Sequence, residues 1–212
     1  MLGNFNKVLV VAPHIDDGEF GCGGAISYMV SAGIEVHYAA FSSCEQSVQP
    51  GFPKDILLKE VREATKVLGI SPDNLHLFEY NVRKFNFHRQ EILDDLLNLR
   101  RSINPDVVLI PSIGDLHQDH ATIAGEALRA FKFSSILSYE LPWNNINFST
   151  TAFVKLEEHH LANKVKALQC YTSQAHRSYA DEEFIRALAR TRGVQINSRY
   201  AEAFEVLRWL LN

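Results

Sequence analysis

The sequence contains little cysteine, since Cys22, Cys44 and Cys170 are the only three in 212 residues. Their number is odd, their spacing is wide and no Cys-x-x-Cys occurs, which argues against a disulfide framework and against a zinc site built from thiolates. We therefore expect all three thiols to be reduced. Cys22 lies among glycines, where a small thiol typically fills space in a packed helix, with metal ligation as the alternative.

Long hydrophobic runs are also missing. No apolar segment approaches the roughly 20 residues that a membrane span requires, and the N-terminus lacks the charged-then-apolar pattern of a signal peptide. We predict a soluble, cytoplasmic protein with no transmembrane segment.

Positive charge is not in excess either, because 21 Lys and Arg stand against 25 Asp and Glu, for a net charge of −4. No cluster of Lys and Arg is interleaved with aromatic residues, so the chain offers no basic stripe for a phosphate backbone. Nucleic acid is therefore not an expected partner.

Apolar residues are abundant, at 46% of the chain, and they alternate between strand-like and helix-like patterns. This length and composition suit one α/β domain over residues 1–212. The alternation predicts a mostly parallel, doubly wound, Rossmann-like sheet with helices on both faces. The expected strands are 8–12, 34–41, 75–80, 107–110 and 134–141, the expected helices are 18–32, 53–68, 88–103, 120–130, 157–173 and 181–192, and 201–211 fits either a closing strand or a helix.

The first chemically distinctive stretch follows the apolar run 8–12. Pro13 lacks the N–H that a central strand position needs, so we expect the strand to end there and a loop to follow. That loop carries His14, Asp16 and Asp17 within four positions. One imidazole and two carboxylates suit Zn²⁺ or another divalent first-row metal.

A second stretch, residues 106–120, repeats this arrangement: an apolar strand, a proline, a short loop, and then His117, Asp119 and His120. In a Rossmann-like strand order of 3-2-1-4-5, the first and fourth strands are neighbours. The crevice between their carboxyl ends is where such sheets bind ligands. The expected topology therefore brings the two motifs face to face.

We assign His14, Asp17 and His120 as metal ligands, because three protein ligands and an open fourth position are typical of a catalytic zinc. Asp16 then remains unligated and is placed to accept a proton from water. A carboxylate beside an imidazole favours the charged imidazole, so His117 next to Asp119 could stabilise an oxyanion or protonate a leaving group. This set suits hydrolysis of an unactivated carbonyl compound.

Two other interpretations of these residues are weaker. Asp16 and Asp17 could serve only as acids at a helix N-terminus, where they complement the helix dipole. The glycine-rich segment 21–24 could suggest a dinucleotide site, but its glycines follow the acids, and carboxylates at that turn would repel a pyrophosphate.

The motifs Pro-His-Ile-Asp-Asp-Gly-Glu (13–19) and His-Gln-Asp-His (117–120) resemble the paired signatures of the PIG-L or LmbE-like zinc-dependent de-N-acetylases. The resemblance implies zinc on the three assigned ligands, Asp16 as general base, and His117, paired with Asp119, stabilising the tetrahedral intermediate. Further matches extend it over most of the chain: Gly-Cys-Gly-Gly (21–24), Glu60, Leu-Gly (68–69), Lys-Ala-Leu (166–168), Tyr-Thr-Ser-Gln (171–174), Arg-Gly (192–193) and Tyr-Ala-Glu-Ala-Phe (200–204).

Three positions depart from the family pattern. Ile15 and Gln118 stand where the family usually has proline, and both are spacers between the proposed functional residues. Leu57 stands where many members carry an arginine that contacts substrate.

The resemblance implies a metal-dependent hydrolase that removes acetate from an N-acetylated amino sugar or its conjugate, a small-molecule partner. A related amidase acting on a larger acyl group, a catalytically silent sugar-binding module and a nucleotide-binding protein are the alternatives. Residues 139–143 either stack an aromatic ring on the sugar or pack in the core. A homo-oligomer is compatible with the sequence.

Overall fold

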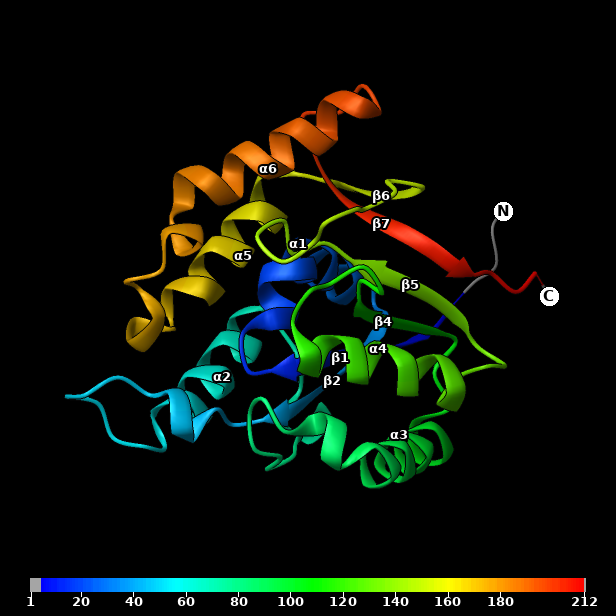
Figure 1. Ribbon diagram of the computed structural model, residues 1–212. Helices are drawn as coiled ribbons and strands as arrows, with labels where there is room; N and C mark the ends of the chain where they lie inside the picture. Colours follow the sequence, from blue (N-terminus) through cyan, green and yellow to red (C-terminus); the bar gives the residue numbers. More distant parts are fainter. Residues whose placement is uncertain (1–4, 212) are drawn as a thin grey trace.

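The structure, a computed structural model that describes residues 5–211, is built around a seven-stranded sheet (Figure 1). In chain order its strands are β1 (Lys7–His14), β2 (Glu35–Ser42), β3 (Leu75–Leu77), β4 (Val107–Pro111), β5 (Ser135–Tyr139), β6 (Ala152–Leu156) and β7 (Tyr200–Arg208).

The strand order across the sheet is β3-β2-β1-β4-β5-β7-β6. Strands β1 to β5 are parallel, and β7 is antiparallel to both β5 and β6. The prediction of a mostly parallel, Rossmann-like sheet with β1 beside β4 is confirmed. The ambiguous segment 201–211 forms a strand over most of its length. The short strand β6, which the sequence pattern did not indicate, pairs with it at the sheet edge.

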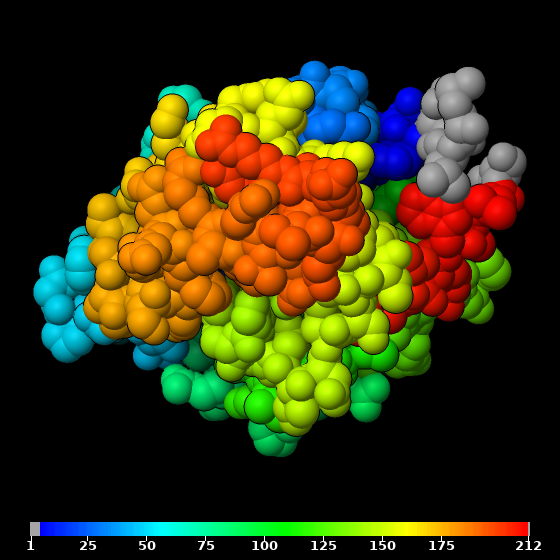
Figure 2. Space-filling model, turned by 90° about the horizontal axis from the view of Figure 1, so that it is seen from above, coloured from blue at the N-terminus to red at the C-terminus, as the bar shows by residue number. Residues whose placement is uncertain are grey.

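Six α-helices cover the sheet, as predicted, on both faces (Figure 1). Alternate residues of β1 divide between two apolar layers: Val8 and Val10 face one layer, and Leu9 and Val11 face the other. From above, α6 forms the outer surface of the first layer (Figure 2). The first layer contains α1 (Asp17–Ser31), α2 (Ile56–Val67), α5 (Glu158–Gln169) and α6 (Glu182–Gln195), and the second contains α3 (Arg89–Ile103) and α4 (Gln118–Ala130).

Strand β1 does not end at Pro13, as the sequence suggested, but continues to His14. Strand β4 pairs with β1 only as far as Val10, so beyond that residue β1 is paired only with β2. A proline is tolerated where a strand is paired on one side alone. His14 therefore belongs to the strand, and the loop that follows it contains only two residues before α1.

Helix α1 approaches the sheet closely through its glycines. A Cβ atom added at Gly21 would overlap the ring of Tyr139, a fully buried side chain whose hydroxyl donates to the Val11 carbonyl at 3.0 Å. Glycine at this position therefore determines how near α1 lies to the centre of the sheet.

We expect Gly21→Ala to lower the free energy of unfolding by about 1–3 kcal/mol, because the buried tyrosine ring cannot move aside without disturbing the core. Thermal unfolding measures this as a fall in Tm of roughly 2–4 °C per kcal/mol for a chain of this size. Gly125→Ala in α4 is the matched control, since no atom lies within 4 Å of its added Cβ. Alanine there should raise stability by up to about 1 kcal/mol; equal effects at both positions would contradict the packing argument.

Among residues 5–211, no helix combines the length and apolar character needed to cross a membrane.

Candidate metal centre

The carboxyl ends of β1 and β4 bring the two polar motifs together. His14 is the last residue of β1, and Asp17 is the first residue of α1. Asp16, between them, adopts a left-handed backbone with φ of 92°, which turns the chain sharply from strand into helix. Aspartate and asparagine are the non-glycine residues that tolerate this conformation best, and such residues cluster at functional sites.

Three atoms from these motifs form a small triangle. Nδ1 of His14 lies 3.1 Å from Oδ2 of Asp17 and 3.1 Å from Nε2 of His120, and the distance from Nε2 of His120 to Oδ2 of Asp17 is 3.2 Å. Ligands held about 2.0–2.1 Å from a tetrahedral zinc ion are roughly 3.3 Å apart. The spacing and the donor types of this triangle therefore fit one face of a divalent first-row metal site.

In both His14 and His120, the ring nitrogen that does not belong to the triangle contacts a buried carboxylate. Nε2 of His14 lies 2.9 Å from Oδ2 of Asp119, and Nδ1 of His120 lies 2.7 Å from Oδ2 of Asp115. A carboxylate behind a histidine fixes the tautomer and the orientation of the ring so that its other nitrogen can bind a metal. Both histidines have such a carboxylate behind them. This arrangement fits a metal site, as the spacing of the triangle also does.

The expected pairing of the Asp119 carboxylate with His117 is wrong. Asp119 lies in the first turn of α4, and its carboxylate reaches His14 and the backbone N–H groups of Arg83 and Phe85. Its own backbone N–H donates instead to Nδ1 of His117 at 3.2 Å. The side chain points away from His117 because the loop that precedes the 3₁₀ turn at Phe85–Phe87 supplies N–H donors on its other side.

His117 is therefore an uncharged side chain in this arrangement. Since Nδ1 accepts a hydrogen bond, the neutral ring carries its proton on Nε2. Burial lowers the pKa of His117, and the neighbouring His120 and His14 lower it further, against a smaller opposing effect of Asp119. The charged form of His117 that the sequence suggested is therefore not favoured. The neutral ring can still donate a hydrogen bond through its Nε2–H group.

The three histidines 14, 117 and 120 also form a group, with ligand atoms within 4.8 Å of one another. That set is looser than the triangle that includes Asp17. His117 also uses one nitrogen to cap α4. We therefore retain Asp17 as the third proposed ligand and leave His117 for another role.

The two adjacent aspartates differ in their electrostatics. Burial opposes ionisation of Asp17, but His120 and His14 hold its pKa well below the usual range. Asp16 has no such partner, and burial together with the charge of Asp17 raises its pKa well above the ordinary value, while Arg177 opposes the rise. Asp17 is suited to remain ionised as a ligand, whereas the raised pKa of Asp16 makes its carboxylate a stronger base than an ordinary aspartate.

A cavity of about 400 Å³ opens over these groups. Its size is within the range of small-molecule sites. Leu57, which replaces the arginine found at this position in many family members, forms part of one wall of the cavity and is almost fully buried. The cavity is lined by His14, Ile15, Asp16, Asp17, Cys44, Ser47, Leu57, Val82, Arg83, His117, His120, Trp143, Asn144, Gln174, Arg177 and Tyr179.

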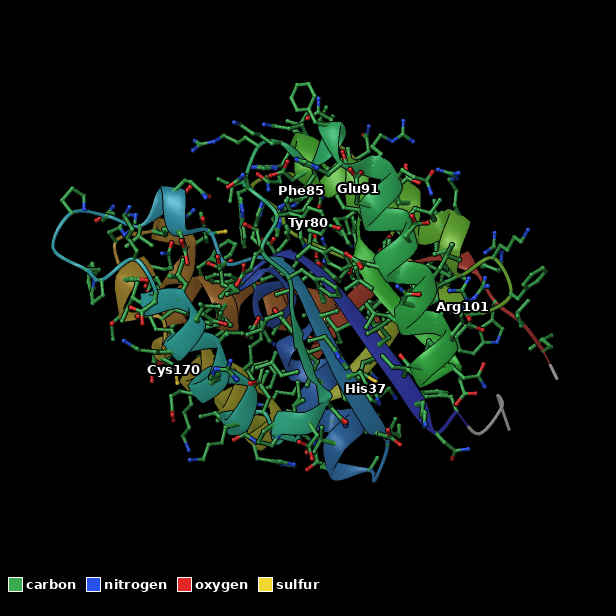
Figure 3. All side chains as sticks on the ribbon, turned by 90° about the horizontal axis from the view of Figure 1, so that it is seen from below. His37, Tyr80, Phe85, Glu91, Arg101 and Cys170 are labelled. Carbon is green, nitrogen blue, oxygen red and sulfur yellow. The ribbon has the colours of Figure 1, made fainter. Side chains whose placement is uncertain are left out.

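No cysteine contributes an atom to the triangle formed by His14, Asp17 and His120. Cys22 is buried in α1, where its thiol contacts the Gly18 carbonyl at 3.2 Å, so it serves as a packing residue. Cys44 lies in the wall of the cavity, and burial raises the pKa of its thiol. Cys170 lies at the end of α5, next to α2 (Figure 3).

Comparison with known families agrees with this geometry. The model of the PIG-L family, described as GlcNAc-PI de-N-acetylase, matches residues 9–131, which is more than half of the chain and includes both motifs. The chain belongs to the PIG-L family. One relative, described as the uncharacterized deacetylase YaiS of Escherichia coli, is 24% identical over 184 residues, covering 82% of this chain and 96% of that protein.

Solved structures show the same fold. The N,N'-diacetylchitobiose deacetylase of Pyrococcus horikoshii, in complex with an inhibitor, has a TM-score of 0.81 at 23% identity over 96% of this PIG-L chain and 84% of its own. GalB of Pseudomonas putida, a 4-carboxy-2-hydroxymuconate hydratase, has a TM-score of 0.79 at 20% identity over 98% of both chains. The fold is therefore shared by proteins with different activities.

Sequence reasoning missed Asp115 in this PIG-L chain and could not place Gln174 and Arg177. Asp115 precedes the second motif by two residues, and its fully buried carboxylate supports His120 while also accepting the His117 N–H at 2.8 Å. Its position five residues before a proposed ligand was the available signal. Gln174 closes the Tyr-Thr-Ser-Gln match to the family, but nothing in the local sequence places it or Arg177 beside the two motifs, and the tertiary structure does so.

Proposed function

We propose that the chain hydrolyses the acetamide group of an N-acetylated amino sugar or its conjugate to a free amine and acetate, and that residues 1–212 act as one deacetylase domain. The observation that carries the proposal is the tight triangle of ligand atoms with an unligated carboxylate, Asp16, in the same cavity. Family membership supports the reaction type, and the fold likeness to a diacetylchitobiose deacetylase is compatible with a sugar substrate.

His14, Asp17 and His120 would hold the metal, and we propose Zn²⁺ because two imidazoles and one carboxylate are a common catalytic zinc set. When bound, such an ion polarises the amide carbonyl and makes a water molecule more acidic. The Asp119 and Asp115 carboxylates hold the two imidazoles in the orientation that binding requires.

The remaining residues of the cavity handle protons. Asp16 accepts a proton from the attacking water, whose hydroxyl forms a bond to the carbonyl carbon. Nε2–H of His117 donates a hydrogen bond to the carbonyl oxygen as that oxygen gains negative charge. When the carbon–nitrogen bond breaks, the leaving nitrogen takes the proton held by Asp16. The immediate products are the free amine and acetic acid, whose proton passes to the amine or to solvent to leave acetate, so atoms and charge balance.

The alternatives are an amidase acting on a larger acyl group, which would release an acid other than acetate, and a silent sugar-binding module, which would bind sugar without turnover. A nucleotide-binding protein would bind dinucleotide and no metal. The cytoplasmic location and a homo-oligomeric state stay predictions.

Removing metal with a chelator should reduce acetate release from N-acetylglucosamine conjugates to background, and adding Zn²⁺ should restore it, because the proposed reaction needs a Lewis acid. Elemental analysis should find about one metal ion per chain before treatment. Circular dichroism before and after chelation shows whether the fold persists. Full activity in protein shown to be metal-free would exclude the proposal.

A further inference from the structure

Part of the cavity wall comes from a segment far from both motifs. Residues 170–181 join α5 to α6 and lie on the side of the molecule toward which the parallel strands run (Figure 1). Within this segment, Gln174, Arg177 and Tyr179 line the same cavity as the candidate catalytic groups. We call residues 172–180 the recognition wall.

A buried carboxylate holds the recognition wall in place. Glu60 of α2 accepts three hydrogen bonds from it: from Thr172 Oγ1 at 2.8 Å, from the Ser173 N–H at 2.9 Å and from Ser173 Oγ at 2.6 Å. Both Glu60 and Ser173 are buried. The wall is therefore a fixed part of the site rather than a mobile cover.

Arg177 is the cation that this wall presents. Its Nε donates to Oε1 of Gln174 at 2.6 Å, and its Nη1 donates to the Tyr179 hydroxyl. Within residues 5–211, Arg177 forms no ion pair with a carboxylate; Asp16 and Asp17 act on it only from longer range. Its second terminal nitrogen, Nη2, therefore remains free to donate to a ligand.

Aromatic packing makes this arrangement rigid. Tyr179 stacks on Trp143 with ring centroids 4.0 Å apart and planes 7° from parallel, and Phe20 packs edge-on against both rings. The Arg177 guanidinium lies 5.5 Å from the centre of the Tyr179 ring. A guanidinium held by a neutral amide, a hydroxyl and an aromatic face keeps its charge and loses little conformational freedom when it binds a ligand.

We propose that Arg177 binds an acidic group of the substrate, so that the amino sugar carries a carboxylate or a phosphate. A half-buried guanidinium without a carboxylate partner, in a cavity that also holds the reacting groups, matches the donor geometry that carboxylates and phosphates require. The cavity of about 400 Å³ has room for one sugar ring and a small acidic substituent. This proposal rests on the proposed deacetylase function and narrows its substrate class.

The test compares matched substrates with and without the acid. We expect kcat/KM for N-acetylglucosamine 6-phosphate or N-acetylmuramic acid to exceed that for N-acetylglucosamine, and the better of the two distinguishes phosphate from carboxylate. Arg177→Gln should lower kcat/KM for the preferred acid by about 10- to 100-fold, mainly through KM, because a hydrogen-bonded charge pair is lost. The kcat/KM for the neutral sugar should fall less, because that substrate lacks the acid and is affected only through the influence of Arg177 on Asp16, and Arg177→Lys should lie in between.

Arg101→Gln is the matched control, since Arg101 is exposed on α3 (Figure 3), does not line the cavity, and hydrogen-bonds only Asn98 of its own helix among the described residues. It should leave both substrates unaffected. Equal kcat/KM for acidic and neutral sugars in the wild type, or an equal loss on both in Arg177→Gln, would overturn the proposal. If Arg177→Gln does not fold, the proposal is still tested by the ratio of kcat/KM for acidic and neutral sugars in the wild type and in Arg177→Lys.

A binding measurement separates this proposal from the reaction itself. Calorimetry should find that glucosamine 6-phosphate or muramic acid binds the wild type at least about tenfold more tightly than glucosamine does, and that Arg177→Gln removes the difference. Acid-dependent binding with no acetate released from any conjugate would refute the proposed function and keep the anion site. Acetate release with no preference for acidic sugars in either assay would support the proposed function and refute the anion site at Arg177.

Discussion

Asp16→Asn should lower the rate of acetate release by about 10²- to 10⁴-fold, the usual contribution of a positioned general base. Asparagine removes the basic oxygen but keeps the size of the side chain. It also tolerates the left-handed backbone at this position, where φ is 92°. The metal triangle does not include Asp16, so metal content should stay at the wild-type level of about one ion per chain.

Steady-state kinetics and elemental analysis on the same preparations measure both quantities. Asp73→Asn provides the control, because Asp73 is an exposed aspartate in a 3₁₀ turn at Pro72–Asn74 on the surface. Its rate should equal that of the wild type. If Asp16→Asn keeps more than a tenth of the activity, another group is the base; if it loses metal, Asp16 is a ligand and the assignment of the triangle is incorrect.

Asp115→Asn should weaken metal binding by about 10- to 100-fold, as expected when the carboxylate behind a ligating histidine loses its charge. Asp115 holds Nδ1 of His120 at 2.7 Å, and the same carboxylate accepts the His117 N–H at 2.8 Å. An amide can still occupy the space, but it holds the imidazole proton less strongly. His120 should then bind a metal less well even though its own ring is unchanged.

Competition with a chromophoric chelator measures this affinity without any assay of activity. Asp106→Asn is a suitable control, since the Asp106 carboxylate also accepts backbone N–H groups, those of Asn6 and Lys7, but lies at the amino end of β4. Metal affinity in that variant should not change. An unaltered affinity in folded Asp115→Asn would show that Asp115 does not support the metal site.

Local sequence pattern was sufficient for most of the fold. The uninterrupted, β-branched apolar run 8–12 favours a strand covered on both faces, and β1 has this environment. Strand β6 was missed because it is a short edge strand with half-buried residues and thus carries neither an apolar run nor a clear alternation. Pro13 was misjudged because its effect depends on where β4 stops pairing, which local sequence does not encode.

For the candidate site too, the sequence predicted some features correctly and others incorrectly. The two motifs supplied His14, Asp17 and His120, whose proposed ligand atoms meet in the structure, and their roles stay predictions until metal is measured. The partner of Asp119 was predicted incorrectly because His117, two residues before it in the sequence, is not the histidine that its carboxylate reaches. In the first turn of a helix, side chains two residues apart point in different directions.

The sequence by itself determined the parallel α/β class and the chemical types of the proposed metal donors, because both depend on residues close together in the chain. The neighbouring placement of the two motifs followed from the strand order that this class implies. Only the tertiary structure decided which carboxylate supports which imidazole, and that Gln174, Arg177 and Tyr179 complete the cavity. The contact between His14 and Asp119 joins residues 105 positions apart, and the three cavity residues come from a segment that follows α5. Their geometry is determined by how helices pack on the sheet, and no local pattern carries that information.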